Sequence, residues 1–313
     1  MEIRTPLDVR GALKEGMARL RAANTPSHTL AAELLLMHAL GRDRTWLYTN
    51  PEAELEAAVS ERYFALVARR VAGEPTQYLT GKQEFWGLEF EVTPAVLIPR
   101  PETEHVIEVA LERLGARGLR IDMVTGAPSP ALRVADVGTG SGCLAVALAQ
   151  ELPHADVFAT DISPAALEVA RRNAARHGVS ERIHFVETNL LESLLRDARR
   201  TGRQSSLFDL IVSNPPYIAR GDADELPREV REYEPHVALF GGPTGIELYA
   251  RLIKQAGSLL SSDGILVLEL GHNSSEHVCS IIAGLPEWTD IGITNDLAGI
   301  PRVITAAHVT TED

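Results

Sequence analysis

The stretch DVGTGSG, residues 136–142, follows an apolar run, residues 132–137, and precedes an alanine-rich stretch, residues 143–152. The apolar run is typical of a buried strand, and the alanine-rich stretch is typical of a helix. Glycines let the backbone turn tightly and approach a ligand closely, and the helix behind them offers free N–H groups. The spacing G-x-G-x-G differs from the dinucleotide fingerprint, because Cys143 stands where the third glycine of G-x-G-x-x-G would fall. We therefore predict a cofactor loop between a strand and a helix, and the spacing disfavours a nicotinamide dehydrogenase.

Strand and helix patterns alternate along the chain on both sides of this loop. Apolar runs predict strands at 132–137, 157–161, 183–186, 210–213 and 265–269, and a last strand within 296–305. Helical periodicity predicts helices at 143–152, 164–177, 245–260 and 275–283. Such alternation is typical of an α/β fold with a doubly wound, mostly parallel, Rossmann-like sheet covered by helices on both faces. We predict loops for the Gly-, Ala- and Pro-rich residues 114–131 and for the polar residues 196–206.

The front of the chain has a different pattern. Between residues 7 and 72, leucines and methionines recur at helical spacings among charged residues and alanines, which predicts a small helical bundle. Residues 83–98 contain a short alternating segment, which predicts a β-hairpin connector. We therefore divide the chain into a helical domain, residues 1–82, and a second domain, residues 83–313, that holds the connector and the parallel sheet.

The composition is that of a globular protein, with 45% apolar and 23% charged residues in a chain of 313. No apolar run is long enough for a membrane span, and MEIRTPLDVR, residues 1–10, lacks the apolar segment of a secretory signal. The two cysteines, Cys143 and Cys279, lie far apart, which argues against a disulfide framework or a zinc site and suits a reducing cytoplasm. The net charge of -13 disfavours a nucleic-acid substrate, which usually needs a basic patch. We expect a cytoplasmic protein without a metal ion, membrane association or direct nucleic-acid contact; its oligomeric state stays open, with a monomer favoured.

The sequence NPPY, residues 214–217, follows the predicted strand 210–213. The two prolines remove two backbone donors and fix φ twice, and Pro215 holds Asn214 in an extended conformation. The result is a stiff turn that presents an amide side chain, backbone carbonyls and the ring of Tyr217. Such a turn suits a planar NH2 group, with two acceptors for its two hydrogens and a ring for its face. The ordinary alternative is a proline-rich loop with an asparagine cap.

An acid, Asp161, ends the predicted strand 157–161, about twenty residues after the glycine loop. A carboxylate in that place can accept hydrogen bonds from both hydroxyls of a ribose. The loop and the acid together resemble the S-adenosylmethionine site of class I methyltransferases. The alternative is a tight strand-to-helix turn with a helix-capping aspartate.

Further motifs run through nearly the whole chain. They are GEP at 73–75, EFWG at 84–87, IPRPETE at 98–104, DVGTGSG at 136–142, NPPYI at 214–218, YEP at 233–235 with Ala238 and Leu239, GG at 241–242, LELG at 268–271 and DLAG at 296–299. In combination they resemble the HemK/PrmC-type peptide chain release factor glutamine N5-methyltransferases. The resemblance implies an S-adenosylmethionine-dependent methyltransferase domain at 83–313, and a helical domain at 1–82 that recognises the substrate factor. It also implies a substrate, the glutamine of the Gly-Gly-Gln motif in class I release factors, and a role in translation termination.

The resemblance carries residue roles as well. The residues implied to hold the methionine end of the cofactor are Gly138, Thr139, Gly140, Ser141 and Gly142. Asp161 would bind the ribose, and Asn189 and Leu190 would lie beside the adenine. The family often has an acid after the third strand, and this chain has Asn189 there, which can hydrogen-bond an adenine edge without a charge.

The glutamine would be gripped by the stiff turn. The residues implied are Asn214, Pro215, Pro216 and Tyr217, with Asn214 also near the cofactor and Leu97 lining the glutamine pocket. One amide N–H would be accepted by the Asn214 side-chain oxygen and the other by the Pro215 carbonyl, which aims the nitrogen and raises its electron density.

Other readings of the same residues stay open. A nucleic-acid amino-methyltransferase, acting on adenine N6 or cytosine N4, would use the same four residues but would need a basic groove. A non-catalytic binding module would have no use for an intact Asn214 and glycine loop. No general base is evident, since Glu102, Glu234 and His236 are each more readily explained as structural residues.

Overall fold

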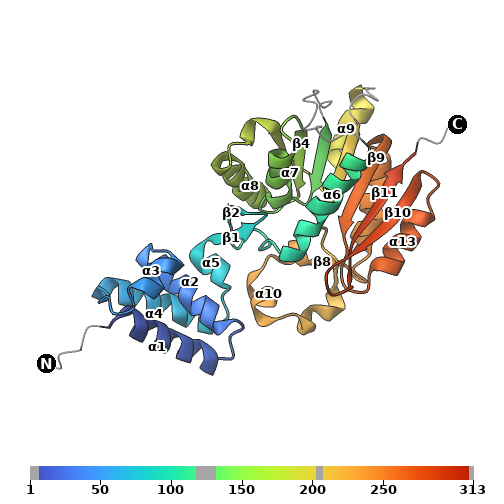
Figure 1. The fold of residues 1–313 in the computed structure, drawn as a ribbon. Coiled ribbons are helices and arrows are strands. Elements are labelled where there is room, and N and C mark those ends of the chain that lie inside the picture. The colour runs from blue at the N-terminus through green and yellow to red at the C-terminus, as the bar shows by residue number, and fades with distance from the viewer. Residues whose placement is uncertain (1–6, 118–131, 202–206, 310–313) are drawn as a thin grey trace. The chain divides into compact units, whose positions relative to one another are not determined.

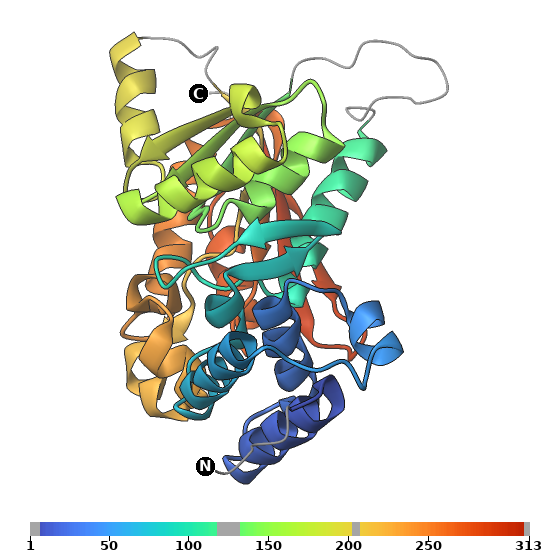
Figure 2. The ribbon, with the colours of Figure 1, turned by 90° about the vertical axis from the view of Figure 1, so that its left-hand side faces the viewer.

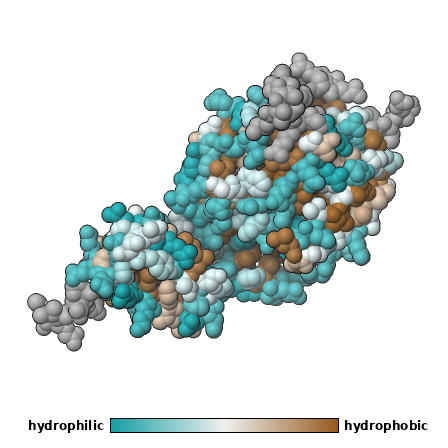
Figure 3. Space-filling view, in the orientation of Figure 1, coloured by the Kyte–Doolittle hydropathy of each residue, from teal (hydrophilic) through white to brown (hydrophobic). Residues whose placement is uncertain are grey.

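The computed structural model describes residues 7–117, 132–201 and 207–309. The described chain divides into two compact units, Met1–Lys82 with Leu226–Tyr233, and Gln83–Glu225 with Glu234–Asp313. Hydrophilic residues cover most of the surface visible in Figure 3, with small hydrophobic patches between them.

The first unit is a bundle of helices (Figure 1). Its helices are α1 Val9–Ala22, α2 His28–Leu40, α3 Arg44–Thr49, α4 Ala57–Val71, α5 Thr76–Thr80 and α10 Arg228–Tyr233. The Asp8 side chain begins α1 by accepting a hydrogen bond from the Gly11 N–H at 2.7 Å, and Gly41, with a φ of 65°, ends α2. The buried guanidinium of Arg70 on α4 lies 2.5 Å from the carboxylate of Glu229 on α10, which ties this later segment to the bundle.

The main sheet of the second unit is made of seven described strands in the order β10-β11-β9-β6-β3-β4-β5. Five of them run parallel to one another: β3 Arg133–Val137, β4 Asp156–Asp161, β5 Ile183–Glu187, β6 Phe208–Ser213 and β9 Leu260–Glu269. The strand β11, Pro301–His308, pairs antiparallel with β9 and with β10, Trp288–Asn295. The sheet is therefore mostly parallel, as predicted.

Helices cover both faces of this sheet (Figures 1 and 2). They are α6 Glu104–Ala116, α7 Cys143–Glu151, α8 Pro164–Arg176, α9 Glu192–Thr201, α12 Glu247–Gly257 and α13 Ser275–Ala283. Neighbouring residues of one strand belong to different core clusters: Leu210 and Val212 pack with α6 and α7, whereas Ile211 packs with α12 and α13. This alternation is what a strand buried on both faces requires.

Shorter elements complete the second unit. They are β1 Lys82–Phe85, β2 Leu88–Glu91, β7 Ile218–Ala219, β8 Phe240–Gly242, α11 His236–Leu239, η1 Pro101–Thr103, η2 Ser180–Arg182 and η4 Arg220–Glu225. The predicted connector is the pair β1 and β2, which form a two-stranded sheet. The buried amide of Asn173 on α8 fastens it: Oδ1 accepts from the Glu91 N–H at 2.7 Å, and Nδ2 donates to the Glu91 carbonyl at 3.0 Å.

Two predictions about elements need correction, and one strand was not predicted. Residues 196–206 are not a loop as far as they are described, because α9 runs to Thr201; Leu194, Leu195 and Ala198 pack against the core while charged residues between them face outward. The predicted loop 114–131 begins inside a helix, since α6 ends at Ala116, and residues 118–131 lie outside the described residues. The strand β10 was not predicted, because it is an edge strand with mostly exposed side chains and lacks an apolar pattern.

Within the described residues, no helix combines the length and apolar character needed to cross a membrane.

Candidate active site

The predicted site residues follow the carboxyl ends of four neighbouring parallel strands. The strands β3, β4, β5 and β6 are all parallel to their neighbours, so the loops that follow them leave the same edge of the sheet. Residues 138–142 follow β3, Asp161 ends β4, residues 189–190 follow β5, and residues 214–217 follow β6. The topology therefore brings together segments that lie up to about eighty residues apart in the sequence.

The glycine loop is held from below and open above. Gly138, Gly140 and Gly142 have φ values of 74°, 55° and 82°, a region that favours glycine. The N–H groups of Gly138 and Thr139 both donate to the Thr160 carbonyl at 2.8 Å. A Cβ on Gly142 would lie 3.0 Å from the Cβ of Ala170, whereas a Cβ on Gly138 or Gly140 would meet nothing within 4 Å. The loop thus leaves space above two glycines for a ligand that approaches the backbone.

Asp136 supports this loop from inside the protein. Its Oδ2 accepts hydrogen bonds from the Thr139 hydroxyl at 2.6 Å and from the Ala145 N–H at 3.1 Å, which joins the loop to the first turn of α7. Its buried Oδ1 has no hydrogen-bond partner among the described residues. Burial raises the pKa of Asp136 to about 7, and the two hydrogen bonds oppose this rise.

Asp161 is positioned by backbone N–H groups. Its Oδ2 accepts from the Gly140 N–H at 2.9 Å and its Oδ1 from the Ser163 N–H at 2.8 Å, so the carboxylate is fixed beside the glycine loop. A carboxylate has about four lone-pair sites, so Asp161 can still accept a hydrogen bond from a ligand hydroxyl. Burial raises the pKa of Asp161, and these hydrogen bonds lower it again. The next residue, Ile162, is 52% exposed, and our sequence analysis missed it although an apolar residue after a strand-ending acid is a readable signal.

Asn189 and Leu190 follow the next strand. The side-chain amide of Asn189 makes no hydrogen bond with the rest of the described chain, so its donors and its acceptor are available to a ligand. Leu190 has a φ of 55° and packs partly against the core cluster beneath α12. The following residue, Leu191, is held by a hydrogen bond from its N–H to Gln255 Oε1 at 2.9 Å.

The stiff turn after β6 presents acceptors that the protein itself leaves unused. Asn214 Nδ2 donates to Thr103 Oγ1 at 3.0 Å. Neither the Asn214 Oδ1 nor the Pro215 carbonyl accepts a hydrogen bond from any described residue. Ser213, just before the turn, donates from its hydroxyl to the Val137 carbonyl at 2.6 Å, which links the turn to the start of the glycine loop.

Three glycines close around the turn. A Cβ on Gly241 would lie 2.4 Å from the Pro216 carbonyl oxygen, and one on Gly245 would lie 2.3 Å from the Tyr217 carbonyl oxygen. A Cβ on Gly271 would lie 2.6 Å from the Tyr217 ring. Burial raises the pKa of Tyr217 to about 12, so its phenol stays protonated near neutral pH. The close approach explains why Gly241, Gly245 and the last residue of LELG, Gly271, are glycine.

The segment before α6 lies against the turn and is held by Glu234. The Glu234 carboxylate accepts from the Arg100 guanidinium at 2.5 Å and from the Ile98 N–H at 3.3 Å. Leu97, next to Ile98, is half-buried. Glu234 thus has a structural role in holding this segment. His236 is exposed, and its ring packs against that of Phe240 with the centroids 5.4 Å apart.

Two buried residues beside Asn214 were missed as site residues, although they lie in motifs already quoted. Thr103, in IPRPETE, and Glu269, in LELG, are each 2% exposed. The Thr103 hydroxyl lies within hydrogen-bonding reach of the Glu269 carboxylate, and burial raises the pKa of Glu269 to about 7. For Glu269 the sequence signal is a carboxylate within an apolar run, residues 265–270, whereas Thr103 stands among polar residues and only the fold places it beside Asn214.

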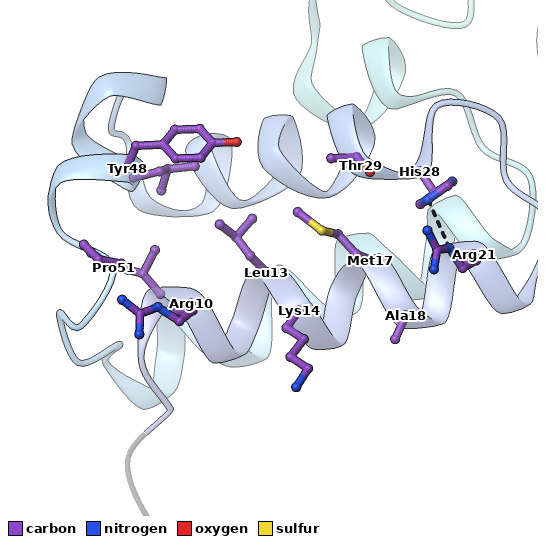
Figure 4. Close-up of a pocket in the computed structure, with 12 residues that line it drawn as sticks. Arg10, Leu13, Lys14, Met17, Ala18, Arg21, His28, Thr29, Tyr48 and Pro51 are labelled. Carbon is purple, nitrogen blue, oxygen red and sulfur yellow. Dashed lines mark hydrogen bonds between the residues drawn. The ribbon is translucent and has the colours of Figure 1, made fainter.

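A separate hollow of about 570 Å³ lies in the first unit, beside α1. Figure 4 shows Leu13 and Met17 pointing from α1 toward the helix above, whereas Lys14 and Ala18 point away. At one end, Arg21 Nε lies 3.4 Å from His28 Nε2. Among the described residues that line the hollow, none has a carboxylate or amide side chain, so it lacks the groups of the site in the second unit.

Comparison with protein families matches two segments of the chain. Residues 11–81 match the PrmC N-terminal domain, and residues 122–229 match the methyltransferase small domain. Among solved structures, the catalytic domain of hMettl16 in complex with the MAT2A 3′UTR hairpin 6 aligns with a TM-score of 0.53 at 18% identity. That alignment covers 79% of this chain and 83% of the other, and it shows a shared methyltransferase fold.

Curated relatives are similar over nearly the full length. The release factor glutamine methyltransferase of Koribacter versatilis is 44% identical, with 97% of this chain and 100% of the relative covered. Proteins of the same name from Nitratidesulfovibrio vulgaris and Chlorobaculum tepidum are 40% and 45% identical. These two alignments cover 95% and 87% of this chain, and 94% and 88% of the relatives.

Proposed function

The chain belongs to the family of release factor glutamine methyltransferases, and we propose that it methylates the glutamine of the Gly-Gly-Gln motif in peptide chain release factors. The methyl group comes from S-adenosylmethionine and goes to the side-chain amide nitrogen, N5. The observation that carries the proposal is the turn at 214–217, beside the cofactor loop, where the Asn214 Oδ1 and the Pro215 carbonyl have no hydrogen-bond partner among the described residues. Two acceptors at a rigid turn suit the two hydrogens of one NH2 group.

The residues at the sheet edge fit S-adenosylmethionine. The open space above Gly138 and Gly140 suits the methionine end, and the fixed carboxylate of Asp161 suits the ribose hydroxyls. Asn189, with an unused amide, and Leu190 would lie beside the adenine, and exposed Ile162 would pack on its face. When bound, S-adenosylmethionine supplies a methyl group on a positively charged sulfur, which is already a strong electrophile.

The amide nitrogen needs help from the protein, because its lone pair is delocalised into the carbonyl. Accepting one N–H at Asn214 Oδ1 and the other at the Pro215 carbonyl fixes the orientation of the amide and raises the electron density on nitrogen. Alignment of this nitrogen with the methyl group supplies most of the remaining gain. The Tyr217 ring, wedged against Gly271, would pack on the amide plane.

The same acceptors explain selectivity for glutamine over glutamate. A glutamate side chain would place oxygen acceptors against the Asn214 oxygen and the Pro215 carbonyl. Sites whose buried polar groups are left unpaired reject such analogues by about 10⁴-fold or more. We therefore expect a release factor with glutamate in place of the motif glutamine to remain unmodified.

The deciding experiment is to incubate the purified chain with methyl-labelled S-adenosylmethionine and either a release factor or duplex DNA. We expect label on the factor, at the motif glutamine by peptide mass spectrometry, and none on DNA. Label on DNA alone would instead favour the adenine N6 or cytosine N4 reading. The variant Asn214→Ala should lose transfer while its affinity for the cofactor, measured by calorimetry, stays close to wild type.

We also propose that the first unit recognises the factor. The match of residues 11–81 to the PrmC N-terminal domain supports this role, and so do the basic residues Arg10, Lys14 and Arg21 around the hollow on α1. The exposed Lys14→Glu variant should raise the KM for the factor without changing the cofactor affinity. The matched control is Lys254→Glu, an equally exposed charge reversal on α12. An unchanged KM in Lys14→Glu would remove this face from the interaction.

We further propose that the enzyme acts as a monomer in the cytoplasm and makes no direct contact with nucleic acid. The acidic total charge of -13 and the protein substrate support this reading. Light scattering of the purified chain at assay concentration tests the monomer, and competition of the assay by added RNA tests the absence of nucleic-acid contact.

A further inference from the structure

A chain of hydrogen bonds leads from the turn into the protein interior. Asn214 Nδ2 donates to Thr103 Oγ1 at 3.0 Å, and the Thr103 hydroxyl lies within hydrogen-bonding reach of the Glu269 carboxylate. Thr103 and Glu269 are each 2% exposed, so water does not compete for these bonds. The second oxygen of Glu269, Oε2, has no partner among the described residues, which leaves the carboxylate dependent on Thr103.

The fold explains why residues so distant in sequence meet here. The strands β6 and β9 are parallel neighbours, with Ser213 paired to Leu268, so Asn214 and Glu269 leave the same edge one residue further on. Thr103, the last residue of η1, is held close by the clamp between Arg100 and Glu234. The arrangement is therefore built by three separate segments of the second unit.

The direction of these hydrogen bonds decides which end of the Asn214 amide faces outward. A threonine hydroxyl has one hydrogen, and a carboxylate is only an acceptor. When Thr103 donates to the Glu269 carboxylate, it can only accept from Asn214, so the amide NH2 points inward and Oδ1 points outward. When Glu269 is neutral, the Thr103 hydrogen is free to bond Asn214 Oδ1, and the reversed amide would offer NH2 to a substrate NH2.

We propose that Thr103 and Glu269 are positioning residues that hold the Asn214 amide with its oxygen toward the substrate. The inference rests on the proposed function, because it assigns Asn214 Oδ1 as the acceptor of the glutamine amide hydrogen. Glu269 touches neither substrate nor cofactor in this role and acts only through Thr103.

The protonation of Glu269 couples the orientation of Asn214 to pH. Burial raises the pKa of Glu269 to about 7, while its hydrogen bond to Thr103 lowers it. Other groups that influence or sense its charge are Glu102, Arg100, Arg302, Tyr217, Tyr249 and Cys143. We expect kcat to rise as pH rises through about 7, because only the ionised Glu269 carboxylate directs the Thr103 hydroxyl so that Asn214 Oδ1 faces the substrate.

Four variants test the proposal. Thr103→Val keeps the shape and removes the hydroxyl, Thr103→Ser keeps the hydroxyl, and Glu269→Gln removes the charge. The matched control is Thr305→Val, which removes another buried hydroxyl, hydrogen-bonded to Arg113 at 3.0 Å, from the strand beside β9. Steady-state kinetics with a release factor separate kcat from KM at saturating cofactor, and calorimetry gives the Kd of S-adenosylmethionine.

We expect Thr103→Val to lower kcat about 10²-fold with little change in KM or cofactor Kd. A wrongly oriented Asn214 amide would slow the transfer step without weakening the binding of substrate or cofactor. Thr103→Ser should keep most of the activity, and Thr305→Val should match wild type. Glu269→Gln should lose the rise of kcat through about pH 7. The proposal is overturned if Thr103→Val lowers thermal stability but keeps kcat, or if Glu269→Gln keeps the wild-type pH profile.

A second measurement needs no substrate. The side-chain amide signals of Asn214 in a ¹⁵N NMR spectrum are identified by their loss in Asn214→Asp. We expect them to shift with pH, with a midpoint near 7, in wild type and to be insensitive to pH in Glu269→Gln. A wild-type enzyme that leaves the factor unmethylated would refute the proposed function, whereas an Asn214 signal indifferent to Glu269 would refute the positioning role alone.

Discussion

The guanidinium of Arg100 lies 2.5 Å from the carboxylate of Glu234, a side chain that is 1% exposed and stands 134 residues further along the chain. The other carboxylate oxygen accepts from the Ile98 N–H at 3.3 Å. Glu234 thereby holds the segment that carries Leu97 and Thr103. This clamp thereby helps to fix the hydroxyl that meets Asn214, together with the hydrogen bond from the Thr103 N–H to the Arg100 carbonyl at 3.1 Å.

We expect Glu234→Ala to lower the free energy of unfolding by about 3 kcal/mol, because removing one partner of a buried pair leaves the other unpaired. Urea denaturation measures this loss. The matched control is Glu232→Ala, two residues away, whose carboxylate forms an exposed i,i+4 pair with Arg228. That change should cost no more than about 0.5 kcal/mol. Equal losses in the two variants would contradict the clamp.

The close packing of Gly241 on the turn gives a second prediction. Gly241→Ala places a Cβ 2.4 Å from the Pro216 carbonyl oxygen, so the turn must move. We expect kcat to fall about 10²-fold, as for other displacements of about 1 Å at a reacting centre. The control Gly115→Ala, on α6, meets nothing within 4 Å and should leave kcat unchanged. A Gly241→Ala enzyme with wild-type kcat would show that the turn tolerates displacement.

Asn189 stands where the family often has an acid, and its unused amide gives a third prediction. Asn189→Asp should tighten S-adenosylmethionine binding about fivefold, because a charge-assisted hydrogen bond to the adenine amino group is stronger by roughly 1 kcal/mol. Asn189→Ala should weaken binding, since the acceptor is lost. Calorimetry measures both values of Kd. Three indistinguishable affinities would place residue 189 away from the adenine.

The buried Glu269 gives a prediction on stability and pH. Its pKa is raised from an ordinary 4.5 to about 7, so the folded chain holds this proton more tightly than the unfolded chain. The stabilisation is complete below about pH 4.5 and is lost as pH rises through about 7. Glu269→Gln cannot ionise, so its stability relative to wild type should increase by on the order of 2 kcal/mol between pH 5 and 8. Denaturation of both proteins at the two pH values checks this, and a constant difference would mean that Glu269 does not titrate in this range.

Much of the fold was predictable from local pattern. The five parallel strands and the helices beginning at Cys143, Pro164 and Ser275 follow from apolar runs, capping residues and glycine punctuation, which act over a few residues. The pattern failed where tertiary contacts decide: α9 is a charged helix whose few apolar residues find the core, and β10 is an exposed edge strand. Residues 226–233 belong with the first unit through Arg70 and Glu229, a pairing over 159 residues that no local signal carries.

The sequence by itself determined the two turns that define the site. The glycines at 138, 140 and 142 and the prolines at 215 and 216 impose backbone geometry wherever they stand, because their φ preferences are properties of the residues themselves. Only the tertiary structure decided which way the Asn214 amide points. Its donors meet Thr103, 111 residues earlier, and Thr103 takes its own direction from Glu269, so the orientation depends on three segments that the parallel order of β6 and β9 brings together.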